Sequence, residues 1–185
     1  MMGVAGLSGD PAYPRISNLK NPVPLGFAGE KVAKGFKKLK WHWWPSYSAV
    51  YKNKKNRYQK MSVDKNYWPK AISNGVKLKS NCRVKKITIN KAGKVNGVIY
   101  LDPKNKEKFQ GAKLVILACN GVGTPRLLLN SANNLHPKGL SNSSGLVGKN
   151  LMLHPLGYVE GKFKNFMASF DGPEGCCIAS HEFYE

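Results

Sequence analysis

The chain has 185 residues, enough for one domain, and its hydrophobic content of 42% argues against wholesale disorder. Thirty Lys and Arg residues stand against ten Asp and Glu residues, so the formal net charge is +20. Such a charge would attract nucleic acid, an anionic membrane or an acidic partner. Because Lys and Asn are spread along most of the chain, a lysine-rich genome explains the charge better than a dedicated binding surface does. The longest apolar run, Leu114 to Cys119, is too short to cross a bilayer.

The first sixty residues predict little regular structure. Residues 10–26 are rich in Pro, Asn and Gly, which is typical of an irregular surface segment. Residues 27–39 place apolar side chains on one helical face and lysines elsewhere, so they predict an amphipathic helix. The Trp-rich run 41–46 (WHWWPS) follows, and we expect the basic residues 51–60 (YKNKKNRYQK) to form a loop.

A second helix is predicted over residues 62–73. Ser62 can serve as its N-cap, and the pair Asn74-Gly75 is typical of a helix end. Pro69 lies inside this segment and is expected to bend or interrupt the helix.

Apolar and polar residues then alternate, which is the pattern of β-strands. Residues 76–89 predict one long strand or two short ones, and residues 95–102 predict the returning strand after a turn at 90–94. A second turn at 103–108 leads to residues 109–119, which end in a continuous apolar run. Such a run predicts a strand that is buried on both faces.

The buried strand is expected to break at a small-residue turn before a leucine-rich helix. Thr124 and Pro125 predict the N-cap and first residue of that helix, which is expected to end near Asn133-Asn134. Glycines in such a turn allow the backbone to approach a ligand closely. The elements together predict a mixed α/β fold, with a three-stranded meander, a buried strand and a following helix.

The cysteines and histidines show no pattern typical of a disulfide framework or a metal site. Cys82 and Cys119 lie in apolar or strand-like runs, Cys176 and Cys177 are adjacent, and no CxxC occurs. We therefore expect buried free thiols and no metal ligands. Free thiols, and a start of the chain unlike a signal peptide, favour the cytoplasm.

Several of these segments occur in the same order in one family of flavoenzymes. Residues 113–132 (KLVILACNGVGTPRLLLNSA), 139–155 (GLSNSSGLVGKNLMLHP) and 67–84 (YWPKAISNGVKLKSNCRV) resemble blocks of the glucose–methanol–choline (GMC) oxidoreductases. The opening GDPAYP, the WHWWPS run and the closing GPEGCCIASHEFYE look like the bacterial branch named for choline, gluconate or sorbose dehydrogenases. The resemblance covers nearly the whole chain.

The resemblance implies a flavoprotein that binds FAD and oxidises CH–OH groups of alcohols or sugar-type polyols. It implies that residues 1–60 lie near the substrate region, that residues 61–153 form part of the FAD-binding domain, and that residues 154–185 begin the substrate domain. Val84 would contact adenine through its backbone, and the turn would lie beside the cofactor. The candidate cofactor-binding residues are Val84, Cys119, Asn120, Gly121 and Gly123.

Two parts that the family uses for catalysis are missing from this sequence. No GxGxxG fingerprint for the FAD pyrophosphate occurs, and the family's catalytic pair, a His with a second His or Asn, belongs to a more C-terminal part. By resemblance, His154 belongs to the join between the flavin and substrate regions, and His181 lies near the end of the chain. We therefore expect an internal fragment without a complete active site, and we assign no catalytic residue.

Two alternatives remain open. Lysines interleaved with aromatic residues in 34–44 and 51–60 would suit a basic nucleic-acid-binding module, although no nucleic-acid motif occurs. The chain could also be a separately encoded subunit that associates with the missing portions of the enzyme. The expected partner of the complete enzyme is a small alcohol or polyol, without a specific nucleic acid or a transmembrane segment.

Overall fold

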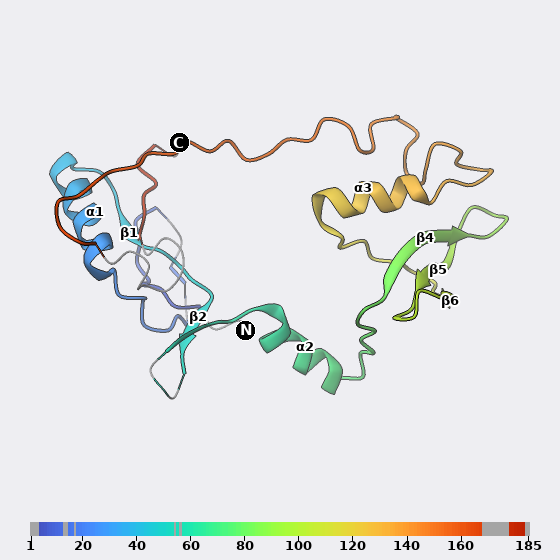
Figure 1. Ribbon diagram of the computed structural model, residues 1–185, viewed down its shortest axis with the longest axis horizontal. Helices are drawn as coiled ribbons and strands as arrows, with labels where there is room; N and C mark the ends of the chain where they lie inside the picture. Colours follow the sequence, from blue (N-terminus) through green and yellow to red (C-terminus); the bar gives the residue numbers. More distant parts are fainter. Residues whose placement is uncertain are drawn as a thin grey trace. The chain divides into compact units, whose positions relative to one another are not determined.

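The computed structural model describes residues 4–12, 15–16, 18–53, 55, 57–167 and 178–183. The chain divides into two compact units, which are treated separately below. Unit 1 comprises residues 1–77 and 159–185, and unit 2 comprises residues 78–158. Helices alternate with short antiparallel strands, so the predicted mixed α/β class is confirmed (Figure 1).

The two units have other boundaries than the three segments 1–60, 61–153 and 154–185 expected from the sequence. The assignment of those segments to substrate and FAD-binding regions stays a prediction. Among the described residues, no helix is both long enough and apolar enough to span a membrane.

Unit 1 contains the helix α1 (Gly26–Leu39), in agreement with the prediction for residues 27–39. Gly29 and Ala33 are buried, so the helix packs through small residues, while its lysines lie outside. Lys40 ends the helix in a left-handed conformation, with a φ of 59°.

Two short antiparallel pairs of strands complete the sheet structure of unit 1. β1 (Trp44–Pro45) pairs with β7 (Ile178–Ala179), and β2 (Val50–Lys52) pairs with β3 (Tyr58–Lys60). The prediction of a loop over residues 51–60 is therefore wrong, because this segment contributes to a hairpin.

The side chain of Asn53 explains the hairpin turn. Its Oδ1 atom accepts hydrogen bonds from the backbone N–H groups of Lys55 and Arg57, at 2.9 and 3.0 Å. An asparagine that bonds to the backbone ahead of it favours a tight turn.

The helix α2 (Val63–Ser73) also belongs to unit 1 and follows the predicted bounds closely. Ser62 occupies the N-cap position, and hydrogen bonding to Ser62 lowers the pKa of Asp64. Gly75 follows the end of the helix with a φ of +89°. The helix continues through Pro69, so the predicted interruption does not occur. A proline removes only one backbone donor, and the neighbouring hydrogen bonds can keep such a helix intact.

Unit 2 is built on the predicted three-stranded meander. β4 (Arg83–Ile89), β5 (Val95–Leu101) and β6 (Glu107–Gly111) pair antiparallel in the order β4-β5-β6. Asn90 Oδ1 and Asp102 Oδ1 each accept two backbone N–H groups in the connecting turns, which confirms both predicted turns. The first strand begins at Arg83, so the alternating residues before Cys82 do not form a strand.

The segment before β4 is held to the meander through Lys79. Lys79 Nζ donates to the Tyr100 hydroxyl at 3.0 Å and to Gln110 Oε1 at 3.2 Å. The hydrogen bond to Tyr100 raises the pKa of Lys79. These two contacts join residue 79 to the strands β5 and β6.

The apolar run Leu114 to Cys119 does not form the predicted buried strand. Val115 and Leu117 are half-buried against the core, whereas Leu114 and Ile116 are 76% and 81% exposed. No strand among the described residues pairs with this run, so only its alternate side chains find neighbours.

The helix α3 (Asn120–Asn130) begins earlier and ends earlier than predicted. Thr124 and Pro125 lie inside it rather than at its start. Asn120 makes the entry turn with a φ of 65°, and its Oδ1 accepts the N–H of Gly121 at 2.5 Å. Because this local hydrogen bond already turns the chain, the helix can start before the Thr-Pro pair.

α3 lies beside β4, and Ser131 joins the two elements (Figure 1). Its side chain has no solvent exposure; the hydroxyl donates to the Leu127 carbonyl at 2.6 Å and accepts the Ile87 N–H at 2.9 Å. Ile87 and Leu127 also form the buried core of the unit with Leu140. The buried hydroxyl of Ser131 therefore provides hydrogen-bond partners for the Ile87 N–H and the Leu127 carbonyl inside an apolar cluster.

Replacement of Ser131 by Ala should lower the free energy of unfolding by about 1–3 kcal/mol, because the Ile87 N–H then loses its acceptor in a buried position. Urea denaturation of the chain would measure the change. Ser73→Ala is the matched control, since Ser73 makes one hydrogen bond at an exposed site in α2, and it should cost about 0.5 kcal/mol or less. An equal decrease in the free energy of unfolding in the two variants would show that the buried Ser131 hydrogen bonds contribute no more than an exposed one.

The exposed side chains of Leu114 and Ile116 predict a binding surface for apolar dyes. The double variant Leu114→Gln/Ile116→Gln should bind less of the neutral dye Nile red than the unmodified chain, without loss of secondary structure. A neutral dye avoids attraction to the charge of +20. Lys113→Gln is the control, because it changes a polar neighbour only. Unchanged dye fluorescence in the double variant would place the apolar surface elsewhere.

Candidate functional site

Three of the five predicted cofactor residues line one open groove of about 620 Å³ between the start of β4 and one face of α3. This volume is within the usual range of ligand sites, roughly 300–1,000 Å³. The lining residues are Cys82, Arg83, Val84, Lys85, Cys119, Gly123, Arg126, Leu127 and Asn130.

The helical wall of the groove follows from the spacing of its residues. Arg126 and Leu127 lie three and four positions after Gly123, and Asn130 lies three positions after Leu127, so the four residues share one face of α3. Gly123 contributes no side chain to this wall. A Cβ atom at this position would lie 3.0 Å from the Cβ of Cys119, which is closer than nearly all contacts of real Cβ atoms. A side chain at 123 would therefore crowd the base of the groove.

The strand wall is an edge of the meander. Among the described residues β4 pairs only with β5, and its register shifts between Val84 and Lys86. Edge strands offer backbone N–H and C=O groups to a ligand, and irregular pairing changes the direction of neighbouring side chains. Val84 is 41% exposed at this position and lines the groove.

The structure brings together three of the five candidate residues. Val84, Cys119 and Gly123 line the same groove, although Val84 is distant from the other two in sequence. Asn120 and Gly121 are not among the lining residues and form the start of α3. A Cβ atom on Gly121 would meet no other atom within 4 Å, so open space adjoins this position. A cofactor role for these five residues stays a prediction.

Sequence analysis missed the basic residues of the groove. Arg83 and Arg126 line it from opposite walls, and Lys85, which is ion-paired with Glu107, lies on the strand side. No acidic residue is among the lining residues, so the groove carries a local positive charge suited to phosphate. The signal for Arg126 was its place three residues after Gly123 in a helix, which puts both on one face.

The thiols differ in their surroundings. Cys82 is half-buried, but Cys119 is exposed, so the prediction of a buried thiol is wrong for Cys119. Because the run before Cys119 forms no strand, no neighbouring strand covers it. Cys176 and Cys177 lie outside the described residues. Within the described ranges, no three His, Cys, Asp or Glu residues are grouped so as to hold a metal ion.

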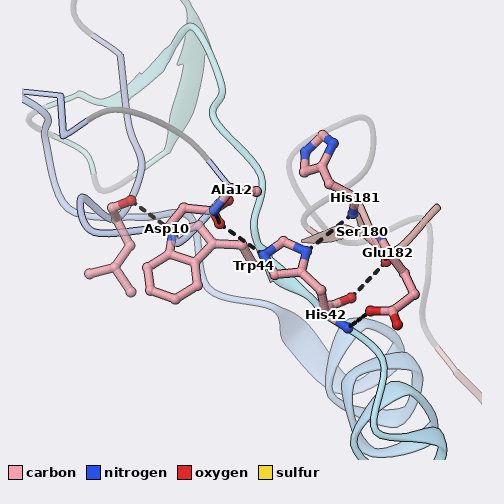
Figure 2. Close-up of polar contacts among 8 residues, drawn as sticks. Asp10, Ala12, His42, Trp44, Ser180, His181 and Glu182 are labelled. Carbon is pink, nitrogen blue, oxygen red and sulfur yellow. Dashed lines mark hydrogen bonds and ion pairs between the residues drawn. The ribbon is translucent and has the colours of Figure 1, made fainter. Parts of the chain in front are cut away.

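The two histidines to which sequence analysis assigned no catalytic role differ in their surroundings. His154 is exposed, with its Nδ1 atom 2.7 Å from the carbonyl oxygen of Pro155. His181 belongs to unit 1, where its backbone N–H donates to His42 Nδ1 (Figure 2). Neither histidine is among the residues that line the groove.

Comparison with known proteins identifies the family. The model of the GMC oxidoreductases matches residues 25–156. The chain is 36% identical to 2-methyl-1,2-propanediol dehydrogenase of Mycolicibacterium austroafricanum, over 98% of this chain and 36% of that protein. It is 37% identical to the fructose dehydrogenase large subunit of Gluconobacter japonicus, over 46% of this chain and 16% of that protein.

An uncharacterized GMC-type oxidoreductase of Mycobacterium tuberculosis is 31% identical over 68% of the chain and 18% of its own length. The chain thus spans about a third of the length of the first of these relatives and less of the others. The family match covers more than half of the chain, including the meander, the groove and α3. The chain therefore belongs to the GMC oxidoreductase family.

Proposed function

We propose that the chain forms part of the FAD site of an oxidoreductase that acts on CH–OH groups of alcohols or polyols. GMC oxidoreductases generally bind FAD, and two relatives are named as dehydrogenases of a diol and of fructose. The observation that carries the proposal is the groove in which Val84, Cys119 and Gly123 come together.

The residues of the groove fit the adenosine diphosphate half of FAD. The exposed side chain of Val84 offers an apolar surface for a planar base, and the edge of β4 offers backbone groups for its polar atoms. Arg83 and Arg126 supply positive charge for phosphate. Gly123 leaves room that a larger side chain would occupy.

In this proposal the residues of the chain bind and orient the cofactor. Val84 would hold adenine, Arg83 and Arg126 would hold phosphate oxygens, and the start of α3 at Asn120 and Gly121 would border the remaining part. When bound, FAD supplies the acceptor for the hydride that leaves the alcohol carbon. No residue of this chain is assigned the removal of the hydroxyl proton.

A nucleic-acid-binding module remains the second candidate because of the charge of +20. One aromatic ring in α1 and one in the basic segment 51–60 already have lysines of the chain over them: Lys31 Nζ lies 5.6 Å from the centre of the Phe27 ring, and Lys52 Nζ lies 5.1 Å from that of Tyr58. Base stacking on these rings would have to displace the lysines. A salt-sensitive gel shift with random single-stranded DNA would favour this alternative.

The proposal is tested by equilibrium dialysis of the chain with FAD, ADP and FMN. Because the sequence has no GxGxxG fingerprint, we expect weak binding of FAD, competition by ADP and a colourless protein after purification. FMN lacks the adenosine half and should bind much more weakly than FAD. Equal binding of FMN and FAD would contradict a site for adenosine diphosphate in the groove.

The substitution Gly121→Val should weaken FAD binding by about tenfold or more, equivalent to about 1.4 kcal/mol. The added side chain meets no atom of the chain within 4 Å at its Cβ, so the loss would come from the space that the cofactor needs. Gly35→Val in α1 is the matched control, since it is also a helical glycine with open space at its Cβ. Wild-type affinity in a folded Gly121→Val variant would remove this position from the cofactor site.

A further inference from the structure

The tripeptide Asn-Gly-Val occurs three times in the chain, at residues 74–76, 96–98 and 120–122. An asparagine before a glycine can react with the backbone, because the glycine has no side chain to shield its amide nitrogen. The nitrogen attacks the side-chain carbonyl carbon Cγ, and ammonia leaves. Since the three sequences are identical, only the local structure can make one of them more reactive than the others.

At the start of α3 the two reacting groups already face each other. The Gly121 N–H donates to Asn120 Oδ1 at 2.5 Å. Because a C=O bond is about 1.2 Å long, the Gly121 nitrogen lies within about 3.7 Å of Asn120 Cγ. This limit is close to the separation of roughly 3–3.5 Å at which two positioned groups react.

The Gly121 nitrogen is not held by the backbone. The first N–H groups of a helix have no carbonyl partner inside it, and Gly121 is the second residue of α3. In the described part of the chain, Asn120 Oδ1 is the only acceptor of this N–H. The nitrogen can therefore approach Cγ without breaking a hydrogen bond of the helix.

Water and space are both available at this pair. Asn120 and Gly121 are exposed, and a Cβ atom on Gly121 would meet no other atom within 4 Å. A five-membered imide ring has room to close there, and water can reach it. The start of a helix also favours negative charge, so a carboxylate product is stabilised at residue 120.

The first of the other two pairs is tied to the end of α2. The Gly75 N–H donates to the Ile72 carbonyl at 3.0 Å, and Asn74 Nδ2 donates to the Lys70 carbonyl at 2.7 Å. Both the attacking nitrogen and the side-chain amide are thus engaged with the helix. Ring closure at Asn74 has to break these hydrogen bonds.

The remaining pair lies within a sheet. Asn96 and Gly97 belong to β5, which pairs with β4 on one side and β6 on the other. Asn96 Oδ1 accepts the Thr88 hydroxyl at 2.6 Å, and the Asn96 carbonyl accepts the Ala112 N–H at 3.0 Å. The backbone and the side chain of Asn96 are therefore both fixed by neighbouring strands.

We propose that Asn120 is a site of spontaneous deamidation, with water as the only other reactant. The Gly121 nitrogen forms a bond to Asn120 Cγ, the Cγ–Nδ2 bond breaks, and the leaving group takes up the amide proton to depart as ammonia. Water then opens the imide. Attack of water at Cγ gives aspartate, and attack at the backbone carbonyl carbon gives isoaspartate, in which the main chain runs through Cγ.

Both products change the entrance of α3. Each adds a negative charge, and isoaspartate also lengthens the main chain there by one carbon atom. The neighbouring residues Cys119 and Gly123 line the groove that contains Arg83 and Arg126. The modified chain should therefore bind ADP more weakly than the fresh chain. This consequence rests on the proposed function, whereas the deamidation itself does not.

The rates at the three asparagines test the proposal. Trypsin places them in separate peptides, residues 71–77, 95–104 and 114–126, so mass spectrometry follows each amide as it becomes a carboxyl group. In guanidinium chloride the three should react at similar rates. In the folded chain at neutral pH, Asn120 should react at least about tenfold faster than Asn74 and Asn96. Equal rates in the folded chain, or an Asn120 as slow as the other two, would overturn the proposal.

The substitution Gly121→Ala tests the role of the unshielded nitrogen. The added methyl group hinders its approach to Cγ, so deamidation of Asn120 should slow at least about tenfold, while the open space leaves the fold unchanged. Gly35→Ala in α1 is the control and should leave the rate at Asn120 as it is. A folded Gly121→Ala chain with the original rate would contradict the mechanism.

Equilibrium dialysis with ADP separates the deamidation from its consequence. The aged chain, with isoaspartate at residue 120 measured by mass spectrometry with electron-transfer fragmentation, should bind ADP more weakly than the fresh chain. Equal binding by both would overturn the consequence for the groove. No ADP binding by the fresh chain would overturn the proposed function, and the three measured rates would still decide the deamidation.

Discussion

The buried hydroxyl of Ser131 is the interaction on which the second unit depends. It satisfies the Leu127 carbonyl at the end of α3 and the Ile87 N–H on the open edge of β4. An N–H group on this strand edge that was buried without an acceptor would destabilise the fold by more than a typical hydrogen bond stabilises it. Because the hydroxyl provides the acceptor, the helix can pack directly on the strand. That packing sets the width of the groove, whose two walls are the same helix and the same strand.

Polar links at the junctions of segments also hold the first unit. His42 joins the segment around Asp10 to the strand β7, and few large apolar side chains among the described residues are fully buried. Where a core is small, such links determine which segments meet. They also place polar groups next to apolar walls, which is the combination that ligand sites require. The groove of unit 2 arises beside a link of this kind, the one that Ser131 makes.

The parts of the fold that sequence analysis predicted correctly depend on local interactions. The meander follows from alternation along each strand, and its turns follow from Asn90 and Asp102, whose side chains bond to the backbone just ahead of them. The parts that it predicted wrongly depend on neighbours. Leu114 to Cys119 has the composition of a buried strand, yet a strand forms only where another strand pairs with it. α3 begins before the predicted N-cap at Thr124, because the local turn at Asn120 already directs the chain into the helix.

The sequence by itself determined the family, the helices α1 and α2, the three-stranded meander of unit 2 and three residues of the groove, Val84, Cys119 and Gly123. These are carried by segments whose residue types and spacing are visible along the chain. Only the tertiary structure decided that Arg83 and Arg126 face the same groove, and that His42 joins Asp10 to His181. The physical reason is that these groups lie far apart in sequence. Their meeting depends on how helices and strands pack, and local periodicity contains no information about that packing.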